Sequence, residues 1–269
     1  CVNKKTEMKK LMFIALMMLS SRMVEAKVYA MIIGVENYYY QNSLRHAKDD
    51  AILFYETMSI THPGMDAEWN VLLDRDATPE KVVAHFIRYI NIIKEDDTFV
   101  FYYSGHGLNE GIYVADDFGK SGLLLYSDLK LAIKLINAKN KLLFLDSCNS
   151  GAIVKESVKQ YENEKLRPYS RSRKSQKSGV NVMLFLGSGV EENSVESSAV
   201  GHGIFTFFLC YGMAGGADFN KDKKVQIDEL FYFFRNNTFE ATKLISSQWQ
   251  CPLLIGNFDK KLVIANLND

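Results

Sequence analysis

The chain has 269 residues, of which 47% are apolar and 24% charged, and these fractions exclude a disordered or collagen-like protein. The 32 basic side chains equal the 32 acidic ones, so no whole-protein electrostatic attraction to nucleic acid or to an acidic membrane is expected. Four cysteines are too few, in a chain of this length, for a fold built on disulfides.

The first 26 residues have the pattern of a secretory signal peptide. Lys9 and Lys10 precede the apolar run 11–19, and the polar stretch after it ends in the small residue Ala26. This run is too short to span a bilayer, which takes about 20 residues. We therefore expect residues 1–26 to be removed, the protein to be exported to a periplasmic or extracellular location, and no stable membrane anchor to remain. The alternative is a short core helix.

The rest of the chain alternates apolar runs with segments of helical periodicity. Strands that alternate with helices predict an α/β fold with a mainly parallel sheet. Thr78 and Ser127 are the expected N-caps of two helices. In chain order we expect strand 27–35, helix 44–58, strand 71–73, helix 79–93, strand 98–103, helix 127–137, strand 141–145, strand 182–186, helices 204–213 and 228–236, and a short final strand 253–255.

The segment 155–178 differs in composition from its surroundings. It carries eight Lys or Arg residues against three Glu, and it is the candidate for a long exposed loop. Nucleic-acid binding by this loop is disfavoured, because the loop has only two tyrosines and one short basic cluster. We therefore expect no nucleic-acid partner.

Reactive side chains follow two of the predicted strands. His106 comes after strand 98–103 and Cys148 after strand 141–145. Open parallel sheets bind ligands at the carboxyl ends of their strands, so neighbouring strands would bring both side chains to one crevice. A thiol beside an imidazole is a nucleophile with its acid/base partner, and the amides of Gly107 and Cys148 could face a developing oxyanion. The alternative is a strand-end histidine and a small buried cysteine with no joint role.

The same residues resemble a known family. The segments YYSGHG (102–107) and LDSCNSG (145–151) are similar to the catalytic signatures of the caspase-like cysteine peptidases, which include caspases, metacaspases, paracaspases and bacterial relatives. The resemblance extends to IIGVENY (32–38), LRHAKDDA (44–51) and GHGIFT (201–206), and it covers most of residues 27–256. It implies that Cys148 hydrolyses peptide bonds with His106, and that Gly107 and Cys148 form the oxyanion hole.

The resemblance also implies an architecture and a domain organisation. The expected fold is a three-layer sandwich with a mainly parallel six-stranded sheet between helices. Residues 27–256 would form a single peptidase domain, followed by a tail at 257–269. Within it, 27–154 would be the large-subunit-like region, 155–178 an activation loop that the enzyme itself cuts, and 179–256 the small-subunit-like region. The oligomeric state is left open.

A basic residue before the cleaved bond is the expected specificity. In metacaspases this pocket is acidic and selects Arg or Lys, and the matching positions here are Asp50, Ser104 and Asp146. A buried pair of carboxylates suits a guanidinium or an ammonium group. The alternatives are a solvated acid in the first helical turn for Asp50 and a structural hydrogen-bond acceptor for Asp146.

Three further hypotheses remain open in the sequence. The first is a calcium site, because the spacing of calcium ligands is found at Asp218, Asn220, Asp222 and Glu229. Lys223 occupies the position that is normally a glycine in such loops, so the alternative is a helix-capping turn. We expect no cofactor to be required. His202, also in a Gly-His-Gly segment, competes with His106 as the base. Cys210 and Cys251 either form a disulfide or stay free.

Two other functions remain open besides hydrolysis of a protein or peptide substrate. One is a non-catalytic binding or scaffold protein on the same fold. The absence of His106 or Cys148 from the chain would have favoured this function. The other is a transpeptidase that uses the same thioester. Product analysis separates ligation from hydrolysis.

Overall fold

The computed structural model describes residues 26–66, 71–115, 122–154, 171–172, 181–189, 193–246 and 249–267. The expected signal peptide lies outside these ranges, apart from Ala26, and so does the basic loop 155–178, apart from residues 171–172. No helix among the described residues is long and apolar enough to cross a membrane.

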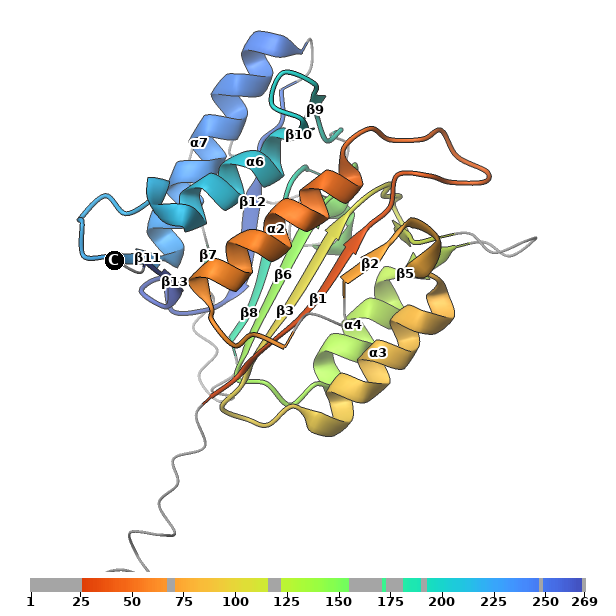
Figure 1. The fold of residues 1–269 in the computed structure, drawn as a ribbon, viewed down its shortest axis with the longest axis horizontal. Helices are drawn as coiled ribbons and strands as arrows, with labels where there is room; N and C mark the ends of the chain where they lie inside the picture. The colour runs from red at the N-terminus through yellow and green to blue at the C-terminus, as the bar shows by residue number, and fades with distance from the viewer. Residues whose placement is uncertain are drawn as a thin grey trace, which may run out of the picture.

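A largely parallel sheet forms the centre of the described structure (Figure 1). Its strand order is β2-β1-β3-β6-β8-β12-β7, and β12 runs antiparallel to β8. The expected mainly parallel six-stranded sheet is thus confirmed, with the two-residue β7 added beyond β12. The strands are β1 (Val28–Gly34), β2 (Val71–Leu73), β3 (Thr98–Ser104), β6 (Asn140–Asp146), β7 (Arg171–Ser172), β8 (Asn181–Leu186) and β12 (Leu253–Asn257).

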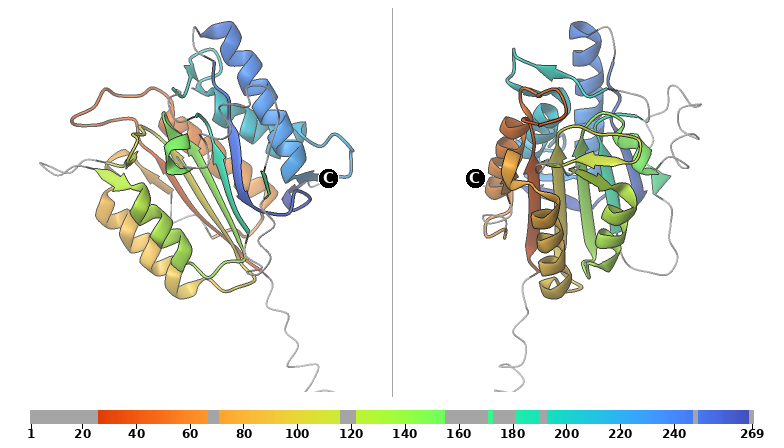
Figure 2. Two further views of the ribbon diagram at one scale, coloured as in Figure 1. Left: turned by 180° about the vertical axis from the view of Figure 1, so that it is seen from behind. Right: turned by 90° about the vertical axis from the view of Figure 1, so that its right-hand side faces the viewer.

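Helices cover both faces of the sheet, as Figure 2 shows from the side. One face packs against α2 (Ala47–Thr61), α6 (Ile204–Tyr211) and α7 (Ile227–Ile245). The other face packs against α3 (Pro79–Ile92) and α4 (Tyr126–Leu135). The three-layer α/β architecture expected from the sequence is therefore confirmed.

The strands are apolar throughout because both of their faces are buried. In β1, Met31 and Ile33 point into the core under α3 and α4, whereas Ala30 and Ile32 point into the core under α2, α6 and α7. Successive side chains of a strand alternate between faces, so a strand covered on both sides needs an apolar residue at every position. This explains why the central strands were readable as unbroken apolar runs.

Two sequence-based details of the helices have opposite outcomes. The Thr78 hydroxyl accepts the backbone N–H of Lys81 and caps α3, as expected. The expected cap at Ser127 is wrong, because α4 begins one residue earlier at Tyr126 and places Ser127 inside the first turn. The buried Tyr126 side chain fixes the start of this helix, since the chain passes from β5 (Leu123–Leu125) straight into it.

Several short elements have no counterpart in the sequence analysis. The expected strand 253–255 is present as part of β12, but it is not the last strand of the chain. β13 (Val263–Asn266) follows within the expected tail and pairs with β11 (Lys224–Gln226). α7 continues to Ile245, nine residues beyond its expected end at 236. Two further short sheets are present: β4 (Gly111–Tyr113) pairs with β5, and β9 (Glu196–Ser197) pairs with β10 (His202–Gly203). The helical turns are η1 (Asp74–Asp76), η2 (Ser150–Val154) and η3 (Gly212–Gly216).

Candidate functional site

A cavity of about 390 Å³ lies at the carboxyl end of the central strands. Neighbouring strands β3 and β6 end side by side, with Ser104 paired to Asp146 in the last register position. His106 and Cys148 follow these strands, and both line the cavity together with Asp50. The structure therefore brings the expected reactive pair and the expected pocket residues to one place.

His106 is held by two groups from the loop between β1 and α2. Its backbone N–H donates to the Tyr38 hydroxyl at 2.9 Å, and the two rings pack at a tilt of 44° with centroids 4.7 Å apart. Its Nε2 lies 2.7 Å from the backbone carbonyl oxygen of Asn42. A carbonyl oxygen only accepts, so Nε2 carries the proton in this contact and Nδ1 is the nitrogen left to take up another. The sequence analysis assigned no role to either residue.

Cys148 sits in a tight turn between β6 and η2. The next residue, Asn149, has a φ of 55°, a left-handed conformation that asparagine tolerates better than most residues. Ser188, at the end of β8, donates from its hydroxyl to the backbone oxygen of Ser147 at 2.8 Å and so fixes the turn. The Cys148 thiol is only partly exposed, and burial raises its pKa. The thiol is therefore protonated at neutral pH and needs a base to become a nucleophile.

Gly107 brings the histidine loop directly against the cysteine turn. A Cβ on Gly107 would lie 2.2 Å from the backbone oxygen of Cys148 and 2.7 Å from Ser147 Oγ. No side chain fits there without separating the two loops. The close approach of the two loops explains why the position has a glycine, and it puts the backbone of Gly107 beside that of Cys148, which lines the cavity.

If the site hydrolyses peptide bonds, as the sequence predicts, Gly107→Ala should lower kcat about a hundredfold, because a displacement of about 1 Å at a reacting group has this effect. The measurement is kcat on a fluorogenic peptide beside a thermal unfolding curve. Gly64→Ala is the matched control, since its φ of 85° strains any side chain but nothing lies within 4 Å of the new carbon. An unchanged kcat in a folded Gly107→Ala protein would show that this contact does not position the reacting groups.

Asp50 is buried, 1% exposed, and its carboxylate is fully engaged by the protein. It accepts hydrogen bonds at 2.9 Å from the Ser104 hydroxyl and at 2.9 Å from the backbone N–H of Gly203. The alternative of a solvated acid in the first turn of α2 is therefore wrong. The apolar stripe of α2 faces the sheet and carries Asp50 inward with it.

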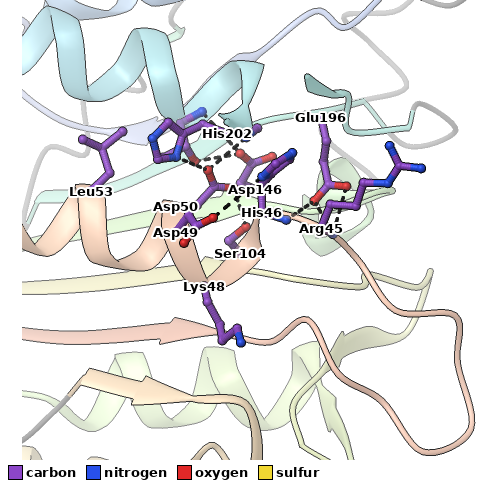
Figure 3. Close-up of polar contacts among 12 residues, drawn as sticks. Arg45, His46, Lys48, Asp49, Asp50, Leu53, Ser104, Asp146, Glu196 and His202 are labelled. Carbon is purple, nitrogen blue, oxygen red and sulfur yellow. Dashed lines mark hydrogen bonds and ion pairs between the residues drawn. The ribbon is translucent and has the colours of Figure 1, made fainter. Parts of the chain in front are cut away.

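Asp146 is the second buried carboxylate of the site. Thr206 donates to it from its hydroxyl at 2.7 Å, and the Ser194 hydroxyl donates to its other oxygen. A Cβ on Gly203 would lie 2.7 Å from Asp146 Oδ2 and 2.9 Å from Asp50 Oδ2, so the two carboxylates face each other across that glycine. Figure 3 shows the pair between α2 and the end of β6.

The sequence analysis missed the groups that hold this pair. His202 Nδ1 lies 3.2 Å from Asp50 Oδ1, and this hydrogen bond raises the pKa of the imidazole. The structure thus places His202 on a pocket carboxylate, whereas His106 is the histidine that lines the cavity beside Cys148. Glu196 also lines the cavity, and its carboxylate accepts the backbone N–H groups of Arg45 and His46 at the start of α2.

The buried Asp146 carboxyl makes a contribution to stability that falls as pH rises. Burial, and then the Asp50 charge, raise the pKa of Asp146 to about 7. The same side chain in an unfolded chain loses its proton near pH 4. Between these values the folded protein binds more protons than the unfolded one, so the free energy of unfolding decreases from about pH 4 to about pH 7.

We expect the contribution of Asp146 to the free energy of unfolding to be about 2–3 kcal/mol smaller at pH 8 than at pH 5, measured by denaturant titration beside the Asp146→Asn variant. Asp146→Asn removes the titrating group and keeps its size, so the decrease should be smaller in this variant. An identical pH dependence in the two proteins would contradict the assignment of this proton to Asp146.

The candidate calcium loop is closed by its own hydrogen bonds. The backbone N–H of Asp222 donates to the side chains of Asp218 and Asn220, at 3.1 and 2.8 Å. The Glu229 carboxylate accepts a backbone N–H at the start of α7 at 3.0 Å and so caps that helix. In the described ranges no three His, Cys, Asp or Glu side chains are arranged to hold a metal ion. The arrangement matches the alternative of a helix-capping turn.

No disulfide joins any of the three cysteines of the described residues. Of the two alternatives for Cys210 and Cys251, the disulfide does not form, because Cys210 points from α6 into the core while Cys251 receives a hydrogen bond from Arg235. Burial raises the pKa of the Cys210 thiol, so it behaves as an apolar core group.

Comparisons with known proteins agree with this geometry. A family model described as a caspase domain matches residues 27–262. No curated protein matches the chain. Among solved structures, the chain is similar to the crystal structure of protein GSU0716 from Geobacter sulfurreducens, with a TM-score of 0.60, 14% sequence identity and coverage of 90% of this chain and 100% of that one. At this identity the likeness concerns the fold alone.

Proposed function

Because the chain belongs to the caspase-domain family of cysteine peptidases, we propose that it is a cysteine endopeptidase that hydrolyses peptide bonds after Arg or Lys. The observation that carries the proposal is one cavity lined by a thiol, an imidazole and two buried carboxylates, those of Cys148, His106, Asp50 and Asp146. The thiol and the imidazole supply the chemistry, and the carboxylates supply a site for a basic side chain.

In the proposed first step His106 accepts the proton of the Cys148 thiol as Sγ attacks the carbonyl carbon of the substrate. Because burial raises the pKa of this thiol, transfer to the imidazole accompanies attack and a stored thiolate is not required. The carbonyl oxygen gains the negative charge, and the backbone N–H groups of Gly107 and Cys148 donate to it. The carbonyl of Asn42 keeps the ring oriented through Nε2.

In the proposed second step the tetrahedral intermediate collapses. The C–N bond breaks, His106 gives its proton to the leaving amine, and the acyl group stays on Sγ as a thioester. His106 then takes a proton from water, whose oxygen attacks the thioester carbonyl, and Sγ leaves with that proton. One peptide bond and one water are consumed, and the enzyme returns to its starting state.

The proposed specificity rests on the charge of the pocket. The carboxylates of Asp50 and Asp146 face each other, and both are buried although they line the cavity together with Ser104. Two like charges in such a place are unfavourable alone, and a guanidinium or ammonium group between them relieves the repulsion. An aspartate at this position of the substrate would add a third negative charge.

We further propose that the protein is exported after removal of residues 1–26 and that it cuts itself within 155–178. The composition of these segments supports both proposals. Intact-mass measurement of the purified protein beside Cys148→Ala tests the second one: cuts after Lys or Arg in this loop are expected in the unmodified protein alone. Cuts in both proteins, or in neither, would contradict self-processing.

A panel of fluorogenic peptides tests the proposed function. The peptides differ only in the residue before the reporter, which is Arg, Lys, citrulline, Asp or Ala. We expect turnover with Arg and Lys and very little with the others, since citrulline has the shape of arginine without its charge. Turnover of Asp peptides alone would refute the basic pocket, and absence of turnover with all peptides would favour a binding protein. Mass analysis with an added amine distinguishes hydrolysis from ligation.

A further inference from the structure

His202 contacts a buried carboxylate of the acidic pocket from the solvent side, and its neighbour Gly203 lines the cavity. Its Nδ1 lies 3.2 Å from Asp50 Oδ1, and its side chain is 21% exposed while that of Asp50 is 2% exposed. The next residue, Gly203, donates its backbone N–H to the same Asp50 oxygen. Figure 3 shows the imidazole beside α2, near Leu53, with its contact to Asp50 drawn. The imidazole therefore contacts a carboxylate that the proposed function assigns to the substrate.

Acidic groups dominate the surroundings of this imidazole. The Asp49 charge, on the exposed side of α2, raises the pKa of His202 further and so favours the imidazolium form. Asp146 faces Asp50 across Gly203, and the Glu196 carboxylate turns away toward backbone N–H groups at the start of α2. The titratable or charged groups around the pair are Arg45 and His46 just before α2, Asp49 from α2, Tyr102 from β3, Asp146 from β6, Glu196 from β9 and Cys210 from α6.

We propose that His202 is a specificity-determining residue: its imidazolium is the internal counter-ion of Asp50, and the basic side chain of a substrate replaces that charge while a proton leaves to solvent. The inference rests on the proposed function and deepens it. While His202 is protonated, the pocket is then not an unpaired pair of carboxylates. In the free enzyme His202 balances Asp50, and in the complex the substrate does.

The exchange makes substrate binding depend on pH in a defined direction. The hydrogen bond to Asp50 raises the pKa of His202, and burial raises that of Asp146, so in mildly acidic solution both groups hold protons and the pocket is neutral overall. As pH rises, both protons leave and the pocket becomes doubly negative. A basic side chain therefore binds more tightly at high pH, and proton binding and substrate binding oppose each other.

Binding to the inactive Cys148→Ala protein tests the inference without interference from catalysis. The probe is acetyl-Gly-Gly-Arg-amide, with the citrulline peptide as its uncharged counterpart, measured by titration calorimetry at pH 6 and pH 8.5. The comparison is with the double variant Cys148→Ala, His202→Gln. The side-chain amide of the introduced glutamine can still donate a hydrogen bond to Asp50 but carries no charge. Calorimetry in buffers of different ionisation enthalpy counts the protons released on binding.

We expect the His202→Gln pocket to bind the Arg peptide at least about fivefold more tightly at pH 6 and about equally at pH 8.5. Fewer protons should be released by this variant at pH 6, and the citrulline peptide should show no such difference. Weaker binding by the variant at both pH values, or an unchanged pH dependence and proton release, would overturn the role of His202 alone. Equal binding of the Arg and citrulline peptides would overturn the basic pocket, and this inference with it.

Discussion

Replacing Cys148 by alanine is expected to lower kcat/KM for an Arg peptide at least about a thousandfold, to the background of the assay. The alanine removes the sulfur that forms the thioester and leaves the fold intact, because the turn is held by Ser188 and by the left-handed Asn149. The affinity for the Arg peptide should stay within about twofold, since the pocket carboxylates are untouched. Initial rates and calorimetric binding measure the two quantities.

His106→Ala is expected to have a similar effect on kcat, because the buried thiol has a raised pKa and does not ionise without a base. The pair should be non-additive: the double variant should be no slower than either single one, as for groups that act as a unit. Cys251→Ala is the control, since this thiol is also partly exposed but lies outside the cavity lining. Full activity in Cys148→Ala would refute the covalent route.

The second large effect concerns selectivity. Asp50→Asn is expected to lower kcat/KM for the Arg peptide by about 30- to 4000-fold, because removal of one partner of a buried charge pair costs about 2–5 kcal/mol. The citrulline peptide makes no charge pair, so its much lower rate should change little. The ratio of the two rates is thus the diagnostic quantity, and a shift in it reports the pocket charge instead of general damage.

Asp49→Asn is the matched control for this experiment. It removes the same charge one residue away on α2, from a side chain that is 58% exposed and points to solvent. Surface charges are screened, so the Arg rate should change by less than about threefold. If both variants lose Arg turnover equally, the overall field of the protein sets the preference and the pocket does not.

The parts of the fold that were predictable are those with one dominant physical cause. β1, β3 and β6 are buried on both faces, and no other requirement competes with their unbroken apolar runs. His106 and Cys148 were found because each follows such a strand, and parallel strands end at the same edge of a sheet. Residue type and position along the chain were enough for these two side chains.

The parts that were not predictable depend on contacts between distant segments. Thr206 and Ser194 reach Asp146 from 60 and 48 residues away, and His202 reaches Asp50 from 152 residues away. The group that orients His106 is the backbone carbonyl of Asn42, which any residue could supply, so it leaves no mark in the sequence. Two-residue strands such as β9 and β10 are too short to show any periodicity.

Labelling with an active-site-directed electrophile tests the central claim most directly. The protein is incubated with a peptidyl acyloxymethyl ketone that carries Arg beside the reactive carbon, and with its citrulline counterpart, and each adduct is located by peptide mass mapping. We predict one adduct, on Cys148, formed much faster with the Arg reagent and greatly slowed in His106→Ala and in Asp50→Asn. Equal labelling of Cys148 and Cys251, or equal rates with the two reagents, would contradict the claim that this cavity holds an activated thiol beside a pocket for a basic side chain.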